Sequence, residues 1–328
     1  MNLRDKNILV TGAGGFIGSH LAKRLVELNN NVKCFIRYNS RNDWGFIEFL
    51  PKEIRDNMEI IPSDLRDSDA VRDATEDVDV VFHLGSLISI PYSYLYPRNS
   101  IETNVIGTLN VLVASKENYV ERIIHTSTSE VYGTAQYVPI DERHPLQAQS
   151  PYSASKIAAD KIAESFYRSY NLPIAIIRPF NTYGPRQSAR AIIPTIITQA
   201  IRSKKIYLGS LHPTRDFTYV EDVVDAFIKI SRTKKAIGEV INVGSGVEIS
   251  IRDLTYKILS LMDKKADIII DKKRIRPQDS EVERLCADNT KARKILGWKP
   301  KINIDDGLMF TIDWISENIQ IYKMHYTI

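Results

Sequence analysis

The sequence predicts an α/β protein with a doubly wound parallel sheet and a smaller C-terminal α/β region. Short apolar segments alternate with helical patterns through residues 1–180, which is typical of parallel strands joined by crossover helices. After about residue 180, turn-rich connections and scattered arginines replace this alternation. We therefore expect one region at 1–180 and a second at 181–328, with some strand and helix of the second returning to the first sheet.

Composition excludes several classes of protein. The 328 residues allow one large domain or two ordinary ones, and 43% hydrophobic residues suffice for a substantial core. The 44 basic and 40 acidic residues leave a formal charge of only +4, so we expect no nucleic-acid partner. No stretch approaches the roughly 20 apolar residues of a membrane span. The apolar run from Ile8 meets glycines too soon for a signal peptide.

Cysteine and histidine usage adds two expectations. The two cysteines, Cys34 and Cys286, lie far apart in sequence and form no paired motif, which favours a reduced, cytoplasmic setting. The six histidines show no metal-ligand spacing, so we expect no metal site.

The first apolar segment, at 7–11, is expected to be a strand, and glycines 12, 15 and 18 lead from it into a helical pattern at 19–27. Strand, glycine loop and helix together predict a Rossmann-type, NAD(P)-binding region. The glycines serve the tight turn, the approach of a pyrophosphate to the helix N-terminus, and close packing of helix on strand. The candidate cofactor contacts here are Gly12, Gly15, Phe16, Ile17 and Gly18. The alternative is a tight turn that binds nothing.

The end of the second expected strand, at 31–37, bears on the choice of cofactor. An NAD site usually has an acid there, but this chain has Arg37, followed by Ser40 and Arg41. Two guanidiniums suit a 2′-phosphate, so the sequence favours NADP modestly over NAD. The alternative is that both arginines are solvated loop charges.

Two further strands are expected at 58–62 and 78–84, each followed by candidate cofactor contacts. Asp64 and Leu65 follow the first of these strands, and Leu84, Gly85 and Ser86 close the second. Asn104, on a helix expected at about 100–118, is either a residue that pins neighbouring backbone near the cofactor or a plain buried amide. These six residues complete the predicted cofactor site outside the glycine loop.

The strongest catalytic candidates lie between residues 126 and 156. An apolar strand expected at 122–126 leads into Thr128, Ser129 and Glu130. Tyr152 and Lys156 lie four residues apart at the start of a helix expected at 153–170, so they share one face of it. A nearby ammonium would lower the pKa of the phenol and make Tyr152 a base near neutral pH. The alternative is an ordinary tyrosine and lysine on an amphipathic helix.

The C-terminal region is expected to bind a diphosphate. We expect helices from about 192 and at 221–232, 250–262, 289–296 and 305–317, with strands at 214–220 and 239–243. Several arginines are spaced along the connections, and converging guanidiniums would match a diphosphate. The alternative for each arginine is a surface charge. The candidate substrate-binding residues are Ser89, Asn181, Arg190, Arg215, Asn242, Arg276 and Glu281.

The motifs together resemble the extended short-chain dehydrogenase/reductase family of nucleotide-sugar enzymes over essentially the whole chain. Thr128-Ser129-Glu130 resembles the 4,6-dehydratases, in particular the form found in GDP-mannose 4,6-dehydratase. The segments 180–194, 208–210 and 213–216 are most similar to the LegB family, the GDP-N-acetylglucosamine 4,6-dehydratases of legionaminic acid synthesis. Those enzymes are usually NAD-dependent, in conflict with the interpretation of Arg37.

This resemblance implies a mechanism and a set of roles. Tyr152 takes the proton of the sugar 4-hydroxyl, Thr128 holds that oxygen, and Lys156 contacts the cofactor ribose. Glu130 then removes the C5 proton, water leaves C6, and the recycled cofactor returns its hydride to C6. Ser129 or Glu130 protonates the leaving hydroxyl.

The resemblance also implies a homodimer through the helices at about 100–118 and 153–170.

The alternative substrates and reactions are dehydration of UDP-N-acetylglucosamine, UDP-glucuronate decarboxylation and 4-epimerisation. A non-catalytic redox-sensing module would have lost the Tyr152/Lys156 pair, and both residues are present.

Overall fold

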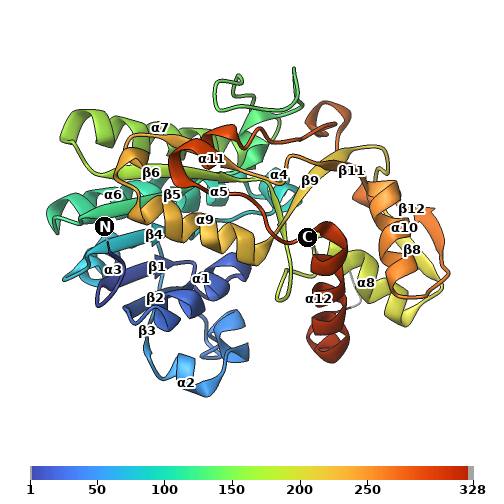
Figure 1. Ribbon diagram of the computed structural model, residues 1–328, viewed down its shortest axis with the longest axis horizontal. Helices are drawn as coiled ribbons and strands as arrows, with labels where there is room; N and C mark the ends of the chain where they lie inside the picture. The colour runs from blue at the N-terminus through green and yellow to red at the C-terminus, as the bar shows by residue number, and fades with distance from the viewer. Residues whose placement is uncertain (1, 324–328) are drawn as a thin grey trace.

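The computed structural model describes residues 2–323, and a seven-stranded parallel sheet forms its centre (Figure 1). The strand order is β10-β6-β5-β4-β1-β2-β3. The bounds are β10 Val240–Val243, β6 Ile174–Pro179, β5 Arg122–Thr126, β4 Val80–His83, β1 Asn7–Thr11, β2 Asn31–Arg37 and β3 Met58–Ser63. All neighbouring pairs are parallel. The predicted doubly wound α/β sheet is confirmed.

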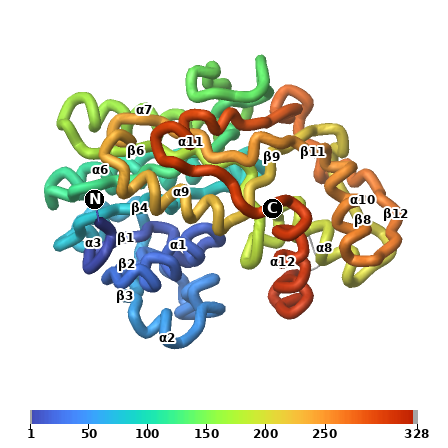
Figure 2. The backbone as a smooth tube through the Cα atoms, viewed as in Figure 1, coloured from blue at the N-terminus to red at the C-terminus, as the bar shows by residue number. Residues whose placement is uncertain are grey.

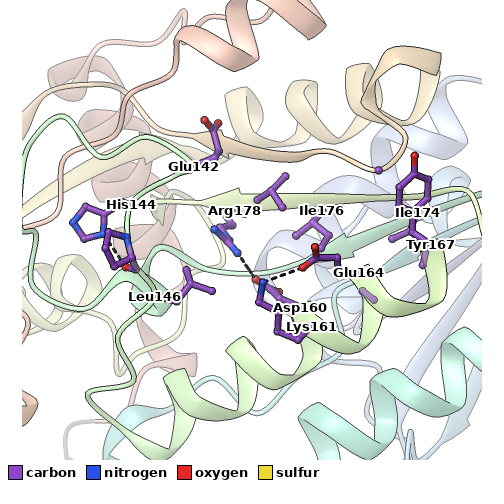
Figure 3. A pocket seen from close by; sticks show the side chains of 14 residues that line it. Glu142, His144, Leu146, Asp160, Lys161, Glu164, Tyr167, Ile174, Ile176 and Arg178 are labelled. Carbon is purple, nitrogen blue, oxygen red and sulfur yellow. Dashed lines mark hydrogen bonds and ion pairs between the residues drawn. The ribbon is translucent and has the colours of Figure 1, made fainter. Parts of the chain in front are cut away.

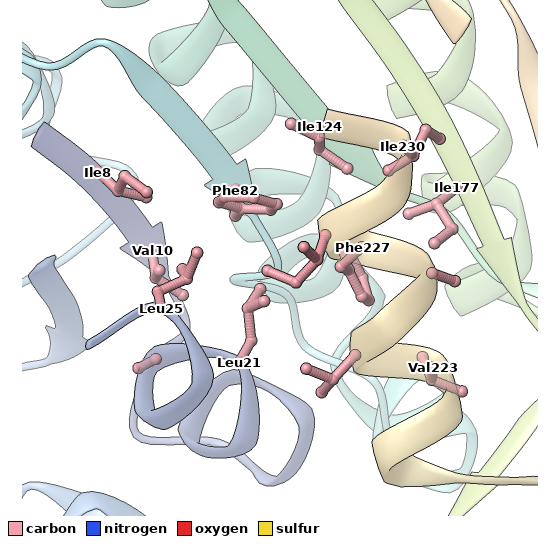
Figure 4. Packing of buried hydrophobic residues seen from close by; sticks show 14 of the residues in the cluster. Ile8, Val10, Leu21, Leu25, Phe82, Ile124, Ile177, Val223, Phe227 and Ile230 are labelled. Carbon is pink, nitrogen blue, oxygen red and sulfur yellow. The ribbon is translucent and has the colours of Figure 1, made fainter. Parts of the chain in front are cut away.

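Helices cover both faces of this sheet, because its central strands are apolar on both sides. On one face, α1 (Phe16–Glu27) and α9 (Val220–Arg232) pack against β1, β4, β5 and β6 through Leu21, Phe227 and their neighbours (Figure 4). On the other, α3 (Ser68–Thr75), α6 (Gly107–Glu117) and α7 (Pro151–Tyr170) bury a second core. Figure 2 shows that α1 and α9, about 200 residues apart in sequence, lie side by side.

A smaller assembly of strands and helices lies beside the carboxyl end of the sheet. It contains the three-stranded sheet β11-β9-β7 and the pair β12-β8. Their bounds are β11 Glu248–Ser250, β9 Thr214–Tyr219, β7 Asn181–Tyr183, β12 Asp267–Ile270 and β8 Lys205–Leu208. With α8 (Ile192–Arg202), α10 (Ile251–Leu261) and α12 (Ile304–Glu317) they enclose a separate core. The chain returns to the large sheet in α9 and β10, which α11 (Thr290–Leu296) flanks.

The helix expected at about 100–118 is in fact three pieces. They are α5 (Pro97–Ile101), a π-helical turn η2 (Glu102–Ile106) and α6. The short helices α2 (Lys52–Arg55), α3 and α4 (Ile90–Leu95) and the strands β7, β8, β11 and β12 were not predicted. All are short, and their periodicity is too brief to separate them from loops. Single π-helical turns often occur at functional sites, and this one contains Asn104.

Candidate active site

The glycine loop has the geometry that its sequence predicts. Gly12 has a φ of +72°, and a side chain there would collide with the Gly85 backbone at 2.8 Å. A Cβ at position 18 would lie 2.2 Å from the Gly12 carbonyl oxygen, so α1 packs directly on the loop. Gly15 is the N-cap of α1. Phe16 and Ile17 form its first turn, half-buried against the core of the smaller assembly.

A chain of buried hydrogen bonds fixes the loops on either side of this turn. Thr11 Oγ1 accepts hydrogen bonds from the backbone of Leu84 and Gly85 and lies 2.8 Å from His83 Nδ1. It therefore donates its own proton to that nitrogen. His83 Nε2 then donates to Thr108 Oγ1 at 3.0 Å. Burial lowers the pKa of His83 well below its usual range. His83 was missed as a site residue because it resembled an ordinary strand residue.

The residues after β3 and β4 form a narrow passage. A Cβ at Gly85 would come within 2.6 Å of Leu65 Cδ1, so a larger residue there would require the Leu65 side chain to move. Ser86 Oγ is buried and has no hydrogen-bond partner among the described residues. An orphaned hydroxyl beside a glycine-lined helix N-terminus fits a dinucleotide, which needs close backbone approach and a few polar contacts.

Asn104 holds neighbouring backbone in place, and its place in the cofactor site stays a prediction. Its side chain accepts from Leu87 N at 2.7 Å and donates to Leu87 O at 3.0 Å and Ser155 Oγ at 2.9 Å. With those bonds made and 1% of its surface exposed, it has little capacity left for a ligand. It ties the loop after β4 to α7, as one of our two interpretations expected.

The charged residues that we expected at the cofactor site after β2 and β3 are partly paired with neighbours. Arg37 and Ser40 are exposed. Arg41 lies 3.4 Å from Asp43 in its own loop. Asp64 pairs with Arg66 at 2.6 Å, and hydrogen bonds from Arg66 are the main reason that the pKa of Asp64 is lowered.

The catalytic candidates converge where β5 ends and α7 begins. Ser150 and Ser153 form a capping box that starts α7 at Pro151, which places Tyr152 in its first turn. Thr128 caps a 3₁₀ turn, η3 (Ser129–Tyr132), which carries Ser129 and Glu130. The Thr128 side chain lies close enough to the Tyr152 phenol to lower the pKa of that phenol, and Lys156 Nζ donates to Thr126 O at 2.7 Å. Ser129 is buried and Glu130 half-buried.

The expected effect of Lys156 on Tyr152 is absent. Burial raises the pKa of Tyr152, and the charges of Glu130 and Asp160 raise it further, against a lowering hydrogen bond from Thr128. Burial also lowers the pKa of Lys156 to about 8, while Asp160 opposes that change. For Tyr152 to act as a base, its phenolate therefore needs a positive charge other than that of Lys156, whose ammonium donates to Thr126 O.

Three of the predicted substrate residues form one cluster beside this centre. The buried Arg215 lies 3.4 Å from Glu281, and Arg276 lies 3.6 Å from the same carboxylate. Burial lowers the pKa of Arg215, and the negative charge of Glu130 opposes that lowering more strongly than any other neighbour. Glu130 therefore lies within electrostatic reach of both Arg215 and Tyr152.

Asn242 does not belong to that cluster, and its predicted role in substrate binding is wrong. It is wholly buried, accepts from the Tyr132 hydroxyl at 2.7 Å and donates to Ile140 O at 3.0 Å. The other candidates lie on loops and element ends. Ser89 caps α4, Asn181 begins β7 with a buried, unpartnered Oδ1, and Arg190 is exposed before α8.

A cavity of about 390 Å³ opens on the other side of Asp160, between α7, the β6–β10 edge and the loop at 142–146 (Figure 3). Asp160 and Arg178 both line it. Thr128, Glu130, Tyr152 and Lys156 do not, so it is distinct from the catalytic centre.

Among the described residues no three histidines, cysteines or acids lie close enough to hold a metal. None of the helices described is long and apolar enough to cross a membrane.

The profile of the family described as GDP-mannose 4,6 dehydratase matches residues 9–311. The chain belongs to this family. It is 32% identical over 329 residues to the dTDP-D-glucose 4,6-dehydratase of Homo sapiens, covering 97% of this chain and 92% of that protein. It is also 32% identical over 317 residues to a putative UDP-glucose 4-epimerase of Methanocaldococcus jannaschii, with 95% and 99% covered.

A solved structure agrees with this family membership. The UDP-glucuronic acid 4-epimerase of Bacillus cereus, in complex with UDP-glucuronic acid and NAD, superposes with a TM-score of 0.87 at 30% identity. The match covers 95% of this chain and 99% of that one. The chain is therefore an extended short-chain dehydrogenase/reductase and an enzyme of the nucleotide-sugar dehydratase and epimerase group.

Proposed function

We propose that this enzyme is a nucleotide-sugar 4,6-dehydratase. The observation that carries the proposal is Glu130, a carboxylate on the η3 turn within electrostatic reach of both Tyr152 and the arginine cluster. A sugar whose diphosphate contacts Arg215 and whose 4-hydroxyl contacts Tyr152 would present its C5 and C6 to that carboxylate. A 4-epimerase needs no base at C5.

The proposed cycle uses four side chains, those of Tyr152, Thr128, Glu130 and Ser129. An NAD(P) held by the glycine loop and Lys156 would supply the hydride acceptor for C4 and the hydride donor for C6, and its oxidised form would place a positive charge near Tyr152 that favours the phenolate. Tyr152 takes the 4-hydroxyl proton, while Thr128 holds that oxygen. The 4-ketone acidifies C5, so Glu130 can remove the C5 proton. The C6 hydroxyl leaves as water with a proton from Ser129 or Glu130.

For the substrate we propose GDP-N-acetylglucosamine, converted to its 4-keto-6-deoxy form for legionaminic acid or another surface glycan. The segment 276–282 resembles the GDP-contacting segment of GDP-mannose 4,6-dehydratase, and two of its residues, Arg276 and Glu281, meet at 3.6 Å beside Arg215. UDP-N-acetylglucosamine is the alternative, because the curated relatives named above act on dTDP and UDP sugars by their descriptions.

For the cofactor we propose a tightly bound NAD(P) that is recycled at each turnover. Arg37 favours NADP. The pairing of Arg41 with Asp43 and the NAD in the B. cereus epimerase favour NAD. Denaturing the purified enzyme and separating the released nucleotide by chromatography distinguishes the two. Two free, buried cysteines are consistent with the cytoplasmic location that we also propose.

We further propose a homodimer through α6 and α7. The apolar side chains of Val113 on α6 and of Ile106 in the preceding turn η2 are exposed. Adjacent exposed apolar side chains commonly mark an interface.

The proposed function is tested by incubating the enzyme, without added cofactor, with GDP-N-acetylglucosamine and separately with UDP-N-acetylglucosamine. Mass spectrometry and NMR then identify the products. We expect the loss of one water from the GDP sugar alone. Water loss from the UDP sugar alone overturns the nucleotide assignment. If neither sugar loses water, two other outcomes identify a different enzyme. Loss of carbon dioxide from UDP-glucuronate would indicate a decarboxylase, and formation of a 4-epimer would indicate an epimerase.

A further inference from the structure

Asp160 is a buried carboxylate that the proposed cycle does not use. It follows Tyr152 and Lys156 at the same four-residue spacing on α7, so the three side chains share one face of the helix. Only 2% of its surface is exposed. A carboxylate this deeply buried costs several kcal/mol unless it is fully paired.

Asp160 joins α7 to the two strands beneath it. Its Oδ2 accepts from Ser127 Oγ at 2.6 Å, and its Oδ1 lies 3.2 Å from His125 Nε2, both at the end of β5. Arg178 on β6 donates to Oδ2 at 2.8 Å and 3.2 Å through Nη2 and Nε. Ser127 directly precedes Thr128, so the bond from Asp160 fixes the point where the catalytic turn leaves the strand.

The same network reaches the turn that carries Glu130. Arg178 Nη1 donates to the Tyr132 hydroxyl at 2.9 Å, and its guanidinium lies over the Tyr132 ring at 5.0 Å. Tyr132 closes η3, two residues after Glu130. One carboxylate therefore connects the helix of Tyr152 and Lys156 with the turn of Thr128 and Glu130.

We propose that Asp160 is the positioning residue of the hydride-transfer step, holding the two halves of the catalytic centre in register through Ser127 and Arg178. This inference rests on the proposed function for the identity of that step. Asp160 does not contact the reacting atoms. It acts through the residues that it binds.

The charge of Asp160 is also set by its surroundings. Burial alone would raise its pKa, but hydrogen bonds from His125 and Ser127 and the charge of Arg178 hold the pKa well below the usual range. Asp160 in turn raises the pKa of Tyr152 and that of Lys156. Glu130, Tyr132 and His83, which stacks on His125, also face this cluster. On the cavity side, the titratable groups beside Asp160 and Arg178 are Glu142, His144, Lys161, Glu164 and Tyr167.

The test measures reduction of the enzyme's own cofactor at 340 nm in a single turnover with the nucleotide sugar, as a function of pH. For Asp160→Asn we expect at least tenfold slower reduction. We also expect both limbs of the pH profile to move to lower pH, since a negative charge near Tyr152 and Lys156 is lost. A purely structural role slows the reaction without moving either limb.

Asp160→Asn leaves Arg178 buried without a counter-charge, so a second variant removes both charges. The double variant Asp160→Asn/Arg178→Gln should fold and shift both limbs in the same direction but by less, because losing the Arg178 charge partly offsets losing the Asp160 charge. Asp222→Asn is the control, because Asp222 is also buried but lies on α9, across the sheet from α7, and accepts from Lys301 N and Ile302 N. If the double variant reduces its cofactor at the rate of the parent enzyme and both limbs of its pH profile are unmoved, the inference is wrong. If the parent enzyme does not reduce its cofactor when the nucleotide sugar is added, the proposed function fails instead.

Discussion

At the scale of single residues, Glu130 separates the two halves of the proposed cycle. Glu130→Gln keeps the shape of the side chain but cannot accept the C5 proton. We expect bound cofactor to be reduced at a rate within a few-fold of the parent, while 6-deoxy product falls by about 100-fold or more. Stopped-flow absorbance and product mass spectrometry measure the two steps.

Glu164→Gln, at a half-buried position of α7 where the side chain pairs with Lys161 and Arg168, is the control and should leave both steps unchanged. Full dehydration by Glu130→Gln would remove Glu130 from the mechanism.

The buried Lys156 should make the free energy of unfolding of the protein depend on pH. Its pKa is about 8 in the folded protein and 10.5 in the unfolded chain, so the unfolded state binds more protons between these values. Its destabilising effect is therefore complete below pH 8 and fades as the pH rises towards 10.5. Against this, the bond to Thr126 O contributes about 1 kcal/mol.

Lys156→Met should therefore raise the free energy of unfolding at pH 7 by on the order of 2 kcal/mol. The advantage should shrink by pH 10. Urea titrations of nucleotide-free protein at both pH values measure it, with the exposed Lys161→Met as control. An equal advantage at both pH values contradicts the buried-ammonium explanation.

At the scale of elements, the β1–α1 unit depends on a contact that only glycine permits. Gly18→Ala would place a Cβ 2.2 Å from the Gly12 carbonyl, which is backbone and cannot rotate away. We expect α1 to shift, the purified protein to lose bound cofactor, and stability to fall by about 2 kcal/mol. Absorbance of released nucleotide and thermal unfolding measure these effects.

Gly297→Ala is the comparison. That residue has a φ of +59° but nothing within 4 Å, so only backbone strain of about 1 kcal/mol follows, with cofactor retained. Equal cofactor loss in both variants would show that stability, and not the α1 contact, controls binding.

Sequence patterns predicted the elements with long, clear periodicity. β1, β2, β5 and α7 have the expected positions, and Gly12 and Gly18 are used as expected. The patterns did not reveal how polar side chains pair across the fold. The side chain of Asn242 is hydrogen-bonded to Tyr132 and Ile140, and that of Asp160 to Ser127 and Arg178. None of these partners is close to its residue in the sequence. Such pairs are decided by tertiary packing, which one sequence does not display.

At the scale of the whole molecule, the outer faces of α6 and α7 predict self-association. In sedimentation velocity at micromolar concentration we expect a dimer, and Ile106→Asp/Val113→Asp should convert it to a monomer by placing charges in the buried interface. Tyr256→Asp, on exposed α10, is the control and should leave the dimer intact. A monomeric parent protein would exclude this interface.

The return of the chain to the large sheet limits how the protein can be divided. β10 is the edge strand beside β6, and α9 supplies Val223 and Phe227 to the core under β4 (Figure 4). A fragment ending at residue 180 would lack both elements and expose that apolar face to water. The two regions are therefore not interchangeable modules: a chimaera that exchanges the substrate-binding part must keep residues 220–243 with the cofactor-binding part, although they lie within the exchanged half of the sequence.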